Sequence, residues 1–98
     1  MKKAYMVEFE LPVPFPEAFI RLIPQQRNTI NYMLADGKIK SYSLANDRSR
    51  LWVIFVAGSE FEVMEMIEEM PLSDYMIPDI QELMFHNSSE NILQFSLN

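Results

Sequence analysis

The sequence predicts an α+β domain in which one four-stranded antiparallel sheet carries two helices on one of its faces. Residues 50–57 form an unbroken apolar run, which is typical of a strand buried on both faces. Segments 17–36 and 60–70 place apolar residues at helical spacing, and the elements follow the order strand, helix, strand, strand, helix, strand. Because the chain has 98 residues, we expect one domain over residues 1–90, followed by a C-terminal arm at 91–98.

The run at 50–57 organises the predicted fold because both of its faces are apolar. Leu51, Val53 and Phe55 fall on one face, whereas Trp52 and Ile54 fall on the other. The element order is that of the ferredoxin-like βαββαβ sandwich, whose two helices shield only one face of the sheet. We therefore expect a second copy of the chain to cover the other face, so that two sheets pair into a dimeric α+β barrel.

The first half of the chain predicts a strand and a long helix. Residues 4–11 alternate in polarity, and the prolines that follow end this strand. The helix begins at Pro16-Glu17 and closes at Asp36-Gly37. Its predicted buried stripe is Phe19, Ile23, Ile30 and Leu34, with Met33 at the edge. We expect Pro24, inside the stripe, to kink the helix or to restart it after a short first turn.

The second half predicts a hairpin, a capped helix and a last strand. Residues 38–45 and the run at 50–57 are joined by a turn cluster and should pair antiparallel. Ser59 and Glu62 form a capping box. The helix that it opens should bury Val63, Met66, Ile67 and Met70, and Pro71 ends it. Residues 77–86 are predicted to be the last strand, in which Pro78 favours an edge position.

The tail carries a separate pattern. Leu93, Phe95 and Leu97 alternate with polar residues, as in a strand that buries one face. Because the sheet already has four strands, we expect this arm to dock on a neighbouring subunit; the alternative is a tail folded over its own helices.

Composition excludes several classes of function. The net charge of −6 and the scattered basic residues argue against a nucleic-acid binder. The absence of cysteine excludes disulfides, thiolate metal sites and cysteine nucleophiles, and the two glycines are too far apart for a phosphate loop. We expect no metal, no cofactor and no membrane partner. Glu8 and Glu10 interrupt the first apolar run, which argues against a signal peptide, so a cytoplasmic location is expected.

The best candidate for chemistry is Glu8, in the middle of the first strand on its less apolar face. If that face looks into a dry cavity between two sheets, this carboxylate can act as a base toward a carbon acid. The alternative is an ordinary edge carboxylate or a salt-bridge partner. His86, the single histidine, is a candidate partner for proton transfer, although a lone histidine is more often a surface or capping residue.

Three further side chains are candidates for binding a substrate. Tyr42 and Tyr75 can donate hydrogen bonds to an enolate or a carboxylate, although half-buried tyrosines usually belong to cores and interfaces. Arg48, in the hairpin turn, can hold an acidic ligand; an exposed turn charge is the alternative.

Two segments give the chain a family resemblance. Met70-Pro71-Leu72-Ser73-Asp74-Tyr75-Met76 resembles the Leu-Pro-Leu-x-x-Tyr-Met turn of the muconolactone isomerases, and Leu83-Met84-Phe85-His86 is similar to their last strand, which ends in Arg-His. Weaker likeness covers nearly the whole chain. Glu8 stands where the family has an acidic residue, but Met6, Leu44 and Phe85 stand where it has basic residues. A lactone that carries a carboxylate needs a cationic anchor, so we expect a more apolar substrate.

The resemblance implies a cofactor-free isomerase of aromatic-compound catabolism that moves a proton on an unsaturated lactone through a dienolate, within a homo-oligomer. In this interpretation Glu8 is the base and His86 is its partner. Two alternatives stay open: a non-catalytic module that binds a small ligand or has a structural role, and a cofactor-free monooxygenase. A polar-rimmed open cavity with Glu8 inside favours an enzyme, whereas a cavity filled by Met6, Leu44 and Phe85 favours a structural role.

Overall fold

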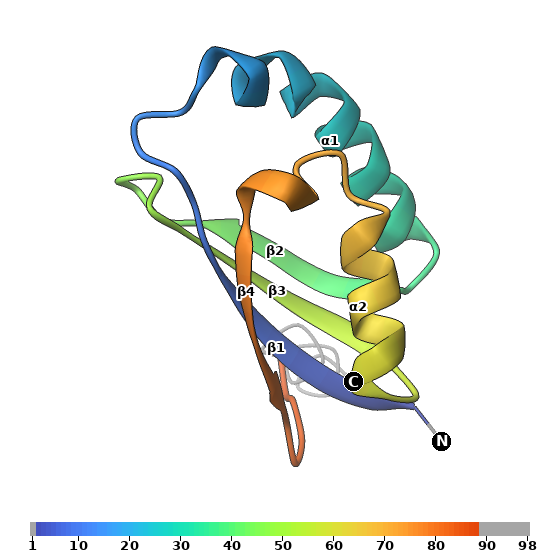
Figure 1. The fold of residues 1–98 in the computed structure, drawn as a ribbon. Coiled ribbons are helices and arrows are strands. Elements are labelled where there is room, and N and C mark those ends of the chain that lie inside the picture. Colours follow the sequence, from blue (N-terminus) through green and yellow to red (C-terminus); the bar gives the residue numbers. More distant parts are fainter. Residues whose placement is uncertain (1, 89–98) are drawn as a thin grey trace, which may run out of the picture.

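The structure, a computed structural model that describes residues 2–88, contains one antiparallel sheet covered by two helices on the same face (Figure 1). The elements are β1 (Lys3–Glu10), α1 (Glu17–Ala35), β2 (Ile39–Leu44), β3 (Arg50–Ala57), α2 (Glu60–Glu68), the short 3₁₀ helix η1 (Ser73–Tyr75) and β4 (Ile77–Glu82). The strand order is β2-β3-β1-β4. The predicted ferredoxin-like fold is therefore confirmed. The predicted arm at 91–98 lies outside the described residues, and the pairing of two subunits stays a prediction.

The core lies between the sheet and the two helices. Val7 of β1 pairs with Val53 of β3. Both are fully buried, as is Val63 of α2, and the largest fully buried side chains of the core are Phe9, Phe55 and Met33. The core thus draws on both inner strands and both helices, as alternate inward positions in β1 and β3 require.

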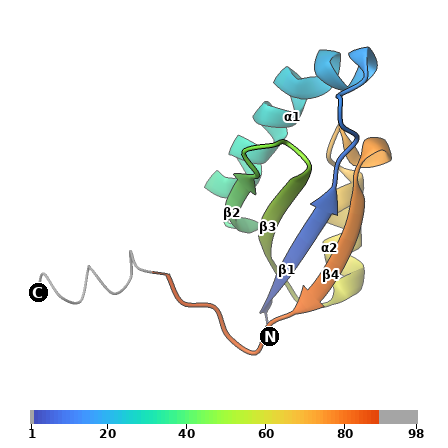
Figure 2. The same ribbon diagram turned by 90° about the vertical axis from the view of Figure 1, so that its left-hand side faces the viewer.

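The other face of the sheet, here called the open face, is covered by no helix in the described part of the chain (Figure 2). Its cross-strand pairs are Ala4↔Val56, Met6↔Ile54, Glu8↔Trp52 and Glu10↔Arg50. On the two central strands, one half of the open face is therefore apolar, and the other half carries three charged residues and Trp52. Ile54 is only 3% exposed even though no helix covers it, which agrees with the prediction that β3 is apolar on both faces.

Helix α1 is continuous from Glu17 to Ala35 with Pro24 inside it, so Pro24 does not restart the helix. Figure 1 shows the axis of α1 bending over its first half, in agreement with the kink that was the other predicted outcome. The buried stripe of α1 differs from its prediction. Met33 is fully buried, whereas Leu34 is 42% exposed. Neighbouring helix positions differ by about 100° in direction, so the rotation that buries Met33 turns Leu34 away from the core.

The start of α2 confirms the capping box in a modified form. The Ser59 hydroxyl accepts a hydrogen bond from the Glu62 amide at 3.2 Å, as predicted. The Glu62 carboxylate, however, accepts from the amide of Gly58 at 2.7 Å, one residue further back than in the usual box. Both bonds satisfy amides that have no partner inside the helix, which fixes where α2 begins.

Strand β4 is shorter than predicted. It occupies an edge of the sheet, as the position of Pro78 favoured, but it ends at Glu82 and not at residue 86. Glu82 pairs with Tyr5, and the Leu83 amide still donates to the Ala4 carbonyl at 2.9 Å. Strand β1 begins at Lys3, so the chain beyond this point has almost no partner strand left. His86 therefore lies outside the sheet.

Candidate functional site

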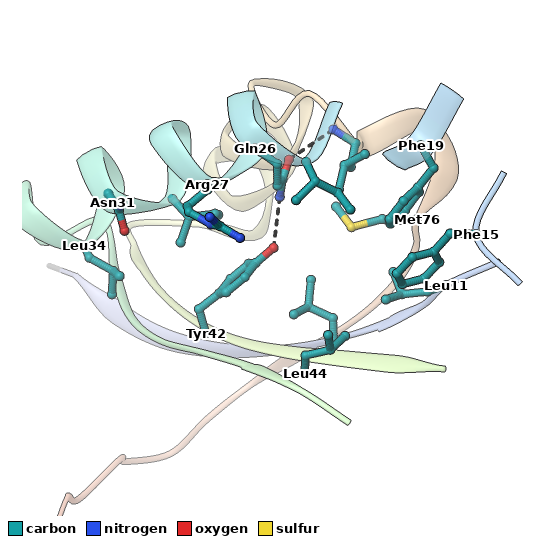
Figure 3. A pocket seen from close by; sticks show the side chains of 14 residues that line it. Leu11, Phe15, Phe19, Gln26, Arg27, Asn31, Leu34, Tyr42, Leu44 and Met76 are labelled. Carbon is teal, nitrogen blue, oxygen red and sulfur yellow. Dashed lines mark hydrogen bonds between the residues drawn. The ribbon is translucent and has the colours of Figure 1, made fainter. Parts of the chain in front are cut away.

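A pocket of about 370 Å³ lies between α1 and the helix-covered face of the sheet (Figure 3). We call it the α1 pocket. Its apolar walls include Leu11, Phe15, Phe19, Ile23, Leu51 and Met76. A pocket of this size and lining suits a small organic molecule, because most ligand sites are apolar clefts with a few placed polar groups.

An aromatic cluster forms one end of the α1 pocket. Phe15, in the proline-rich segment before α1, stacks on Phe19 with 4.2 Å between the ring centroids. Tyr75 of η1 packs edge-on against Phe19 at 5.7 Å. Tyr75, predicted to bind substrate, is not among the residues that line the pocket; it supports a ring that does line it.

The polar part of the pocket is organised by Gln26, which is 3% exposed and is the one buried polar residue in the described part of the chain. Its side-chain nitrogen donates to the Tyr42 hydroxyl oxygen at 3.2 Å. Its side-chain oxygen accepts from the Leu72 amide at 3.1 Å. Gln26 thereby joins α1 to β2 and to the segment that follows α2, and both bonds are drawn in Figure 3.

Tyr42, Arg27 and Asn31 complete the polar lining. Burial raises the pKa of Tyr42, and the hydrogen bond from Gln26 opposes this rise only in part, so the phenol stays protonated at neutral pH. Arg27 is exposed and makes no ion pair within residues 2–88. Figure 3 shows its side chain reaching from α1 toward Tyr42. The pocket therefore offers hydrogen-bond donors and a positive charge beside apolar walls.

The structure places Leu44 in the lining of the α1 pocket and Arg48 outside it. Arg48, predicted to bind substrate, is an exposed residue of the β2–β3 turn with a φ of 67°, and its amide donates to the Ala45 carbonyl. It does not line the α1 pocket. Leu44, which stands where the family has a basic residue, does line it. Arg27 thus supplies, from α1, a positive charge in the lining of the α1 pocket, where the residue contributed by β2 at position 44 is an uncharged leucine.

Glu8, predicted to be the base, lies on the open face, on the opposite side of the sheet from the α1 pocket. Its carboxylate accepts a hydrogen bond from the Trp52 indole at 2.9 Å, and the Arg50 guanidinium lies 3.6 Å away. Arg50 also approaches Glu10 at 3.8 Å. Glu8 is thus the centre of a charged cluster on a surface that no described helix covers.

His86 lies near the beginning of β1. It lines a second hollow of about 490 Å³ together with Lys2, Lys3 and Lys40. The chain approaches this hollow next to Ala4, which lies four residues, or roughly 13 Å, along β1 from Glu8. A single subunit therefore does not bring Glu8 and His86 together, and their joint role stays a prediction.

Sequence reasoning missed Gln26, Arg27 and Asn31. A signal for Gln26 was present, because position 26 continues the spacing of Phe19, Ile23, Ile30 and Met33 in alternating steps of four and three. A glutamine at a core position of a helix calls for buried partners. Arg27 and Asn31 gave no such signal, since their place beside Tyr42 depends on how α1 crosses β2.

Residues 2–88 contain no group of three or more histidine, aspartate or glutamate side chains that could hold a metal ion. None of their helices is both long enough and apolar enough to cross a membrane.

Comparison with known proteins gives the family. The search of curated proteins found no match. The family model for muconolactone delta-isomerase matches residues 4–89, which cover every strand and helix of the fold except Lys3, the first residue of β1. This chain belongs to the muconolactone delta-isomerase family.

Proposed function

We propose that the protein acts on a small, mainly apolar organic molecule by cofactor-free proton transfer. The α1 pocket is the proposed binding site for such a molecule, and the open face, where Glu8 lies, is the proposed place of a reaction that uses Glu8 as its base. The observation that carries the proposal is the pocket itself: about 370 Å³, with apolar walls and a short polar row formed by Gln26, Arg27, Asn31 and Tyr42. Family membership supports the class of reaction, because the family model is that of an isomerase.

Two of these polar side chains have a direct role in this proposal. Arg27 attracts a carboxylate at the mouth of the pocket, where its exposed guanidinium makes no ion pair with the described residues. The Tyr42 hydroxyl donates a hydrogen bond to a carbonyl oxygen. If a proton leaves the neighbouring carbon, negative charge develops on that oxygen, and the same donor stabilises it more strongly than in the ground state.

Proton transfer also needs a base. We keep Glu8 as the proposed base and His86 as its proposed partner, and the structure limits where they can act. A substrate in the α1 pocket is separated from Glu8 of the same subunit by the sheet, whereas a substrate on the open face can reach it beside Trp52. Catalysis by Glu8 therefore requires a substrate on the open face.

The second candidate function is a non-catalytic module that binds a small ligand. One observation favours it: the residues that line the α1 pocket include no carboxylate and no imidazole. A pocket without such a group can hold and polarise a carbonyl compound but has no ordinary base for a carbon acid. The sequence led us to expect either an open cavity with Glu8 inside it, which favours an enzyme, or a cavity filled by apolar side chains, which favours a structural role. The α1 pocket is open, but Glu8 lies outside it, and Leu44 lines the pocket without filling it, so neither expectation is met.

We also propose that a second copy of the chain covers the open face. Its apolar half, formed by Ala4, Met6, Ile54 and Val56, supports this. Ile54 is already buried, but Met6 is 37% exposed and Val56 is half-buried, so covering them would add part of the about 1.5–3 kcal/mol that full burial of a large apolar side chain contributes. Light scattering at micromolar concentration should report at least a dimer, and Val56→Glu should weaken it. A folded wild-type monomer under these conditions would contradict the proposal.

The experiment uses muconolactone and its uncharged methyl ester. Binding is followed by amide chemical shifts of ¹⁵N-labelled protein, and turnover is followed by ultraviolet absorbance. Ile23→Trp fills the α1 pocket, because Ile23 lines it. Ile20→Trp is the matched control on the same helix, since Ile20 is 52% exposed and does not line the pocket. Glu8→Gln and His86→Asn test the proposed proton-transfer pair.

The outcomes separate the candidates. If the α1 pocket is the substrate site, Ile23→Trp lowers binding and turnover at least tenfold, whereas Ile20→Trp changes them less than twofold. If the reaction takes place on the open face, Glu8→Gln abolishes turnover and Ile23→Trp does not. Pocket binding without turnover identifies a non-catalytic module. No shift at the pocket residues with either compound refutes the α1 pocket as the site.

A further inference from the structure

The hydrogen bonds of Gln26 are fixed by its surroundings. The backbone amide of Leu72 can only donate, so the side-chain oxygen of Gln26 must face it, at 3.1 Å. The side-chain nitrogen is then turned toward the Tyr42 hydroxyl, at 3.2 Å. An amide nitrogen can only donate, so the Tyr42 oxygen must be the acceptor in this contact.

This arrangement decides what Tyr42 can offer to a ligand. A tyrosine hydroxyl has one proton to donate, and the contact with Gln26 does not use it. No other side chain or carbonyl in residues 2–88 takes this proton. Tyr42 lines the α1 pocket, so its proton is available there to a ligand. The guanidinium of Arg27, at the same wall, contains only hydrogen-bond donors and no acceptor atom.

We propose that Gln26 is a positioning residue that holds the Tyr42 hydroxyl as a hydrogen-bond donor toward the α1 pocket, so that the pocket selects ligands that present a carbonyl or carboxylate oxygen over the same ligands without an acceptor oxygen. This inference rests on the proposed function, because it takes the α1 pocket as the ligand site. It adds the substrate class: a small apolar carbonyl compound or carboxylate. The Gln26 side chain acts on the ligand only through Tyr42.

A single substitution should reverse the direction of the hydrogen bond between residue 26 and the Tyr42 hydroxyl. Gln26→Glu keeps the shape of the side chain but replaces its donor with a second acceptor. The new carboxylate accepts from the Leu72 amide and from the Tyr42 hydroxyl, and these two bonds favour its ionised form. The Tyr42 hydroxyl then donates its hydrogen bond to residue 26, and only its acceptor lone pairs face the pocket. Gln25→Glu is the matched control, because Gln25 is the exposed neighbour and receives the same charge.

The test compares acetophenone with ethylbenzene, two uncharged probes of similar shape, of which only the ketone has an acceptor oxygen. Dissociation constants at pH 8 come from ¹⁵N amide shifts of residues lining the α1 pocket. We expect the wild type to favour the ketone and Gln26→Glu to lower the ketone-to-hydrocarbon preference about fivefold to tenfold, the value of one hydrogen bond. Gln25→Glu should leave the preference unchanged.

Tyr42→Phe keeps the test decisive if the Gln26 variant does not fold. It removes the donor without touching the Leu72 contact, so the ketone preference should fall by a similar factor. Where Gln26→Glu does fold, adding it to Tyr42→Phe should change nothing more. An unchanged preference in folded Gln26→Glu, or in Tyr42→Phe, overturns the role of Gln26 while the pocket remains a ligand site. If neither probe shifts the pocket residues of the wild type, the proposed site is wrong and this inference falls with it.

Discussion

Replacing Arg27 by glutamine tests whether the α1 pocket receives an anion. Arg27 lines the pocket and makes no ion pair within the described chain, whereas Arg21, on the same helix, pairs with Glu17 at 2.6 Å and does not line the pocket. Both arginines are exposed. Arg27→Gln and Arg21→Gln remove the same charge from the same helix, so their difference isolates the local contact from the net charge.

The expected magnitude follows from the exposure of Arg27. A hydrogen bond to a charged group contributes about 1.5–3 kcal/mol when it is shielded from water. Exposed ion pairs contribute up to about 1 kcal/mol, because solvent screens them. Since Arg27 is exposed at the pocket mouth, we expect Arg27→Gln to lose about 1 kcal/mol of binding free energy for a carboxylate, which raises Kd about fivefold. The uncharged ester should lose less than twofold.

The assay is the amide-shift titration with muconolactone and its methyl ester, carried out at low and at high salt. The effect of Arg27→Gln on the acid should shrink as salt is added, because counterions screen an exposed charge. An equal loss in Arg27→Gln and Arg21→Gln, or an equal loss for acid and ester, would show that Arg27 does not hold the carboxylate.

Three further predictions concern the core, the buried phenol and the tail. Met66→Asp should lower the free energy of unfolding by about 3 kcal/mol or more, since Met66 is 9% exposed and the new charge would be buried. Glu65→Lys, on the exposed side of α2, should change the free energy of unfolding by less than about 0.5 kcal/mol. Equal effects of the two substitutions in urea denaturation would contradict the assignment of the buried face of α2. Because burial raises the pKa of Tyr42 above its ordinary value of 10.0, the unfolded chain loses this proton first, and the free energy of unfolding should fall as pH rises above 10.0; Tyr42→Phe should lose less over the same range, and an identical alkaline loss would contradict this. Removing residues 91–98 should lower the oligomeric state or the melting temperature with unchanged circular dichroism, and full assembly and melting behaviour in the truncated protein would refute the docking arm.

The fold could be predicted because local patterns fix the elements. Strand β3 has the predicted bounds, Arg50–Ala57, since an apolar run with a turn cluster before it and a glycine after it leaves little choice. The cap at Ser59 was likewise readable, because its partner Glu62 is three residues away. Interactions between residues close in sequence are visible in the sequence, and most of this fold's elements are bounded by them.

The errors arose where a distant partner decides the outcome. Leu34 and Met33 are neighbours at the edge of one stripe, and only the sheet beneath α1 settles which of them is buried. The last strand ends at Glu82 because β1, more than 70 residues earlier in the chain, begins at Lys3. A strand without a partner cannot satisfy its backbone groups, whatever its own pattern favours.

The sequence alone determined the order of the elements, the apolar character of β3 on both faces, and the family likeness that the family model confirms over residues 4–89. It also named Tyr42 as a candidate binding residue. Only the tertiary structure decided that Tyr42 meets Gln26 and Arg27 at one pocket while Glu8 lies on the other side of the sheet. The physical reason is that a sheet has two faces: alternation assigns residues of one strand to opposite sides, but the packing of the helices decides which side encloses a pocket.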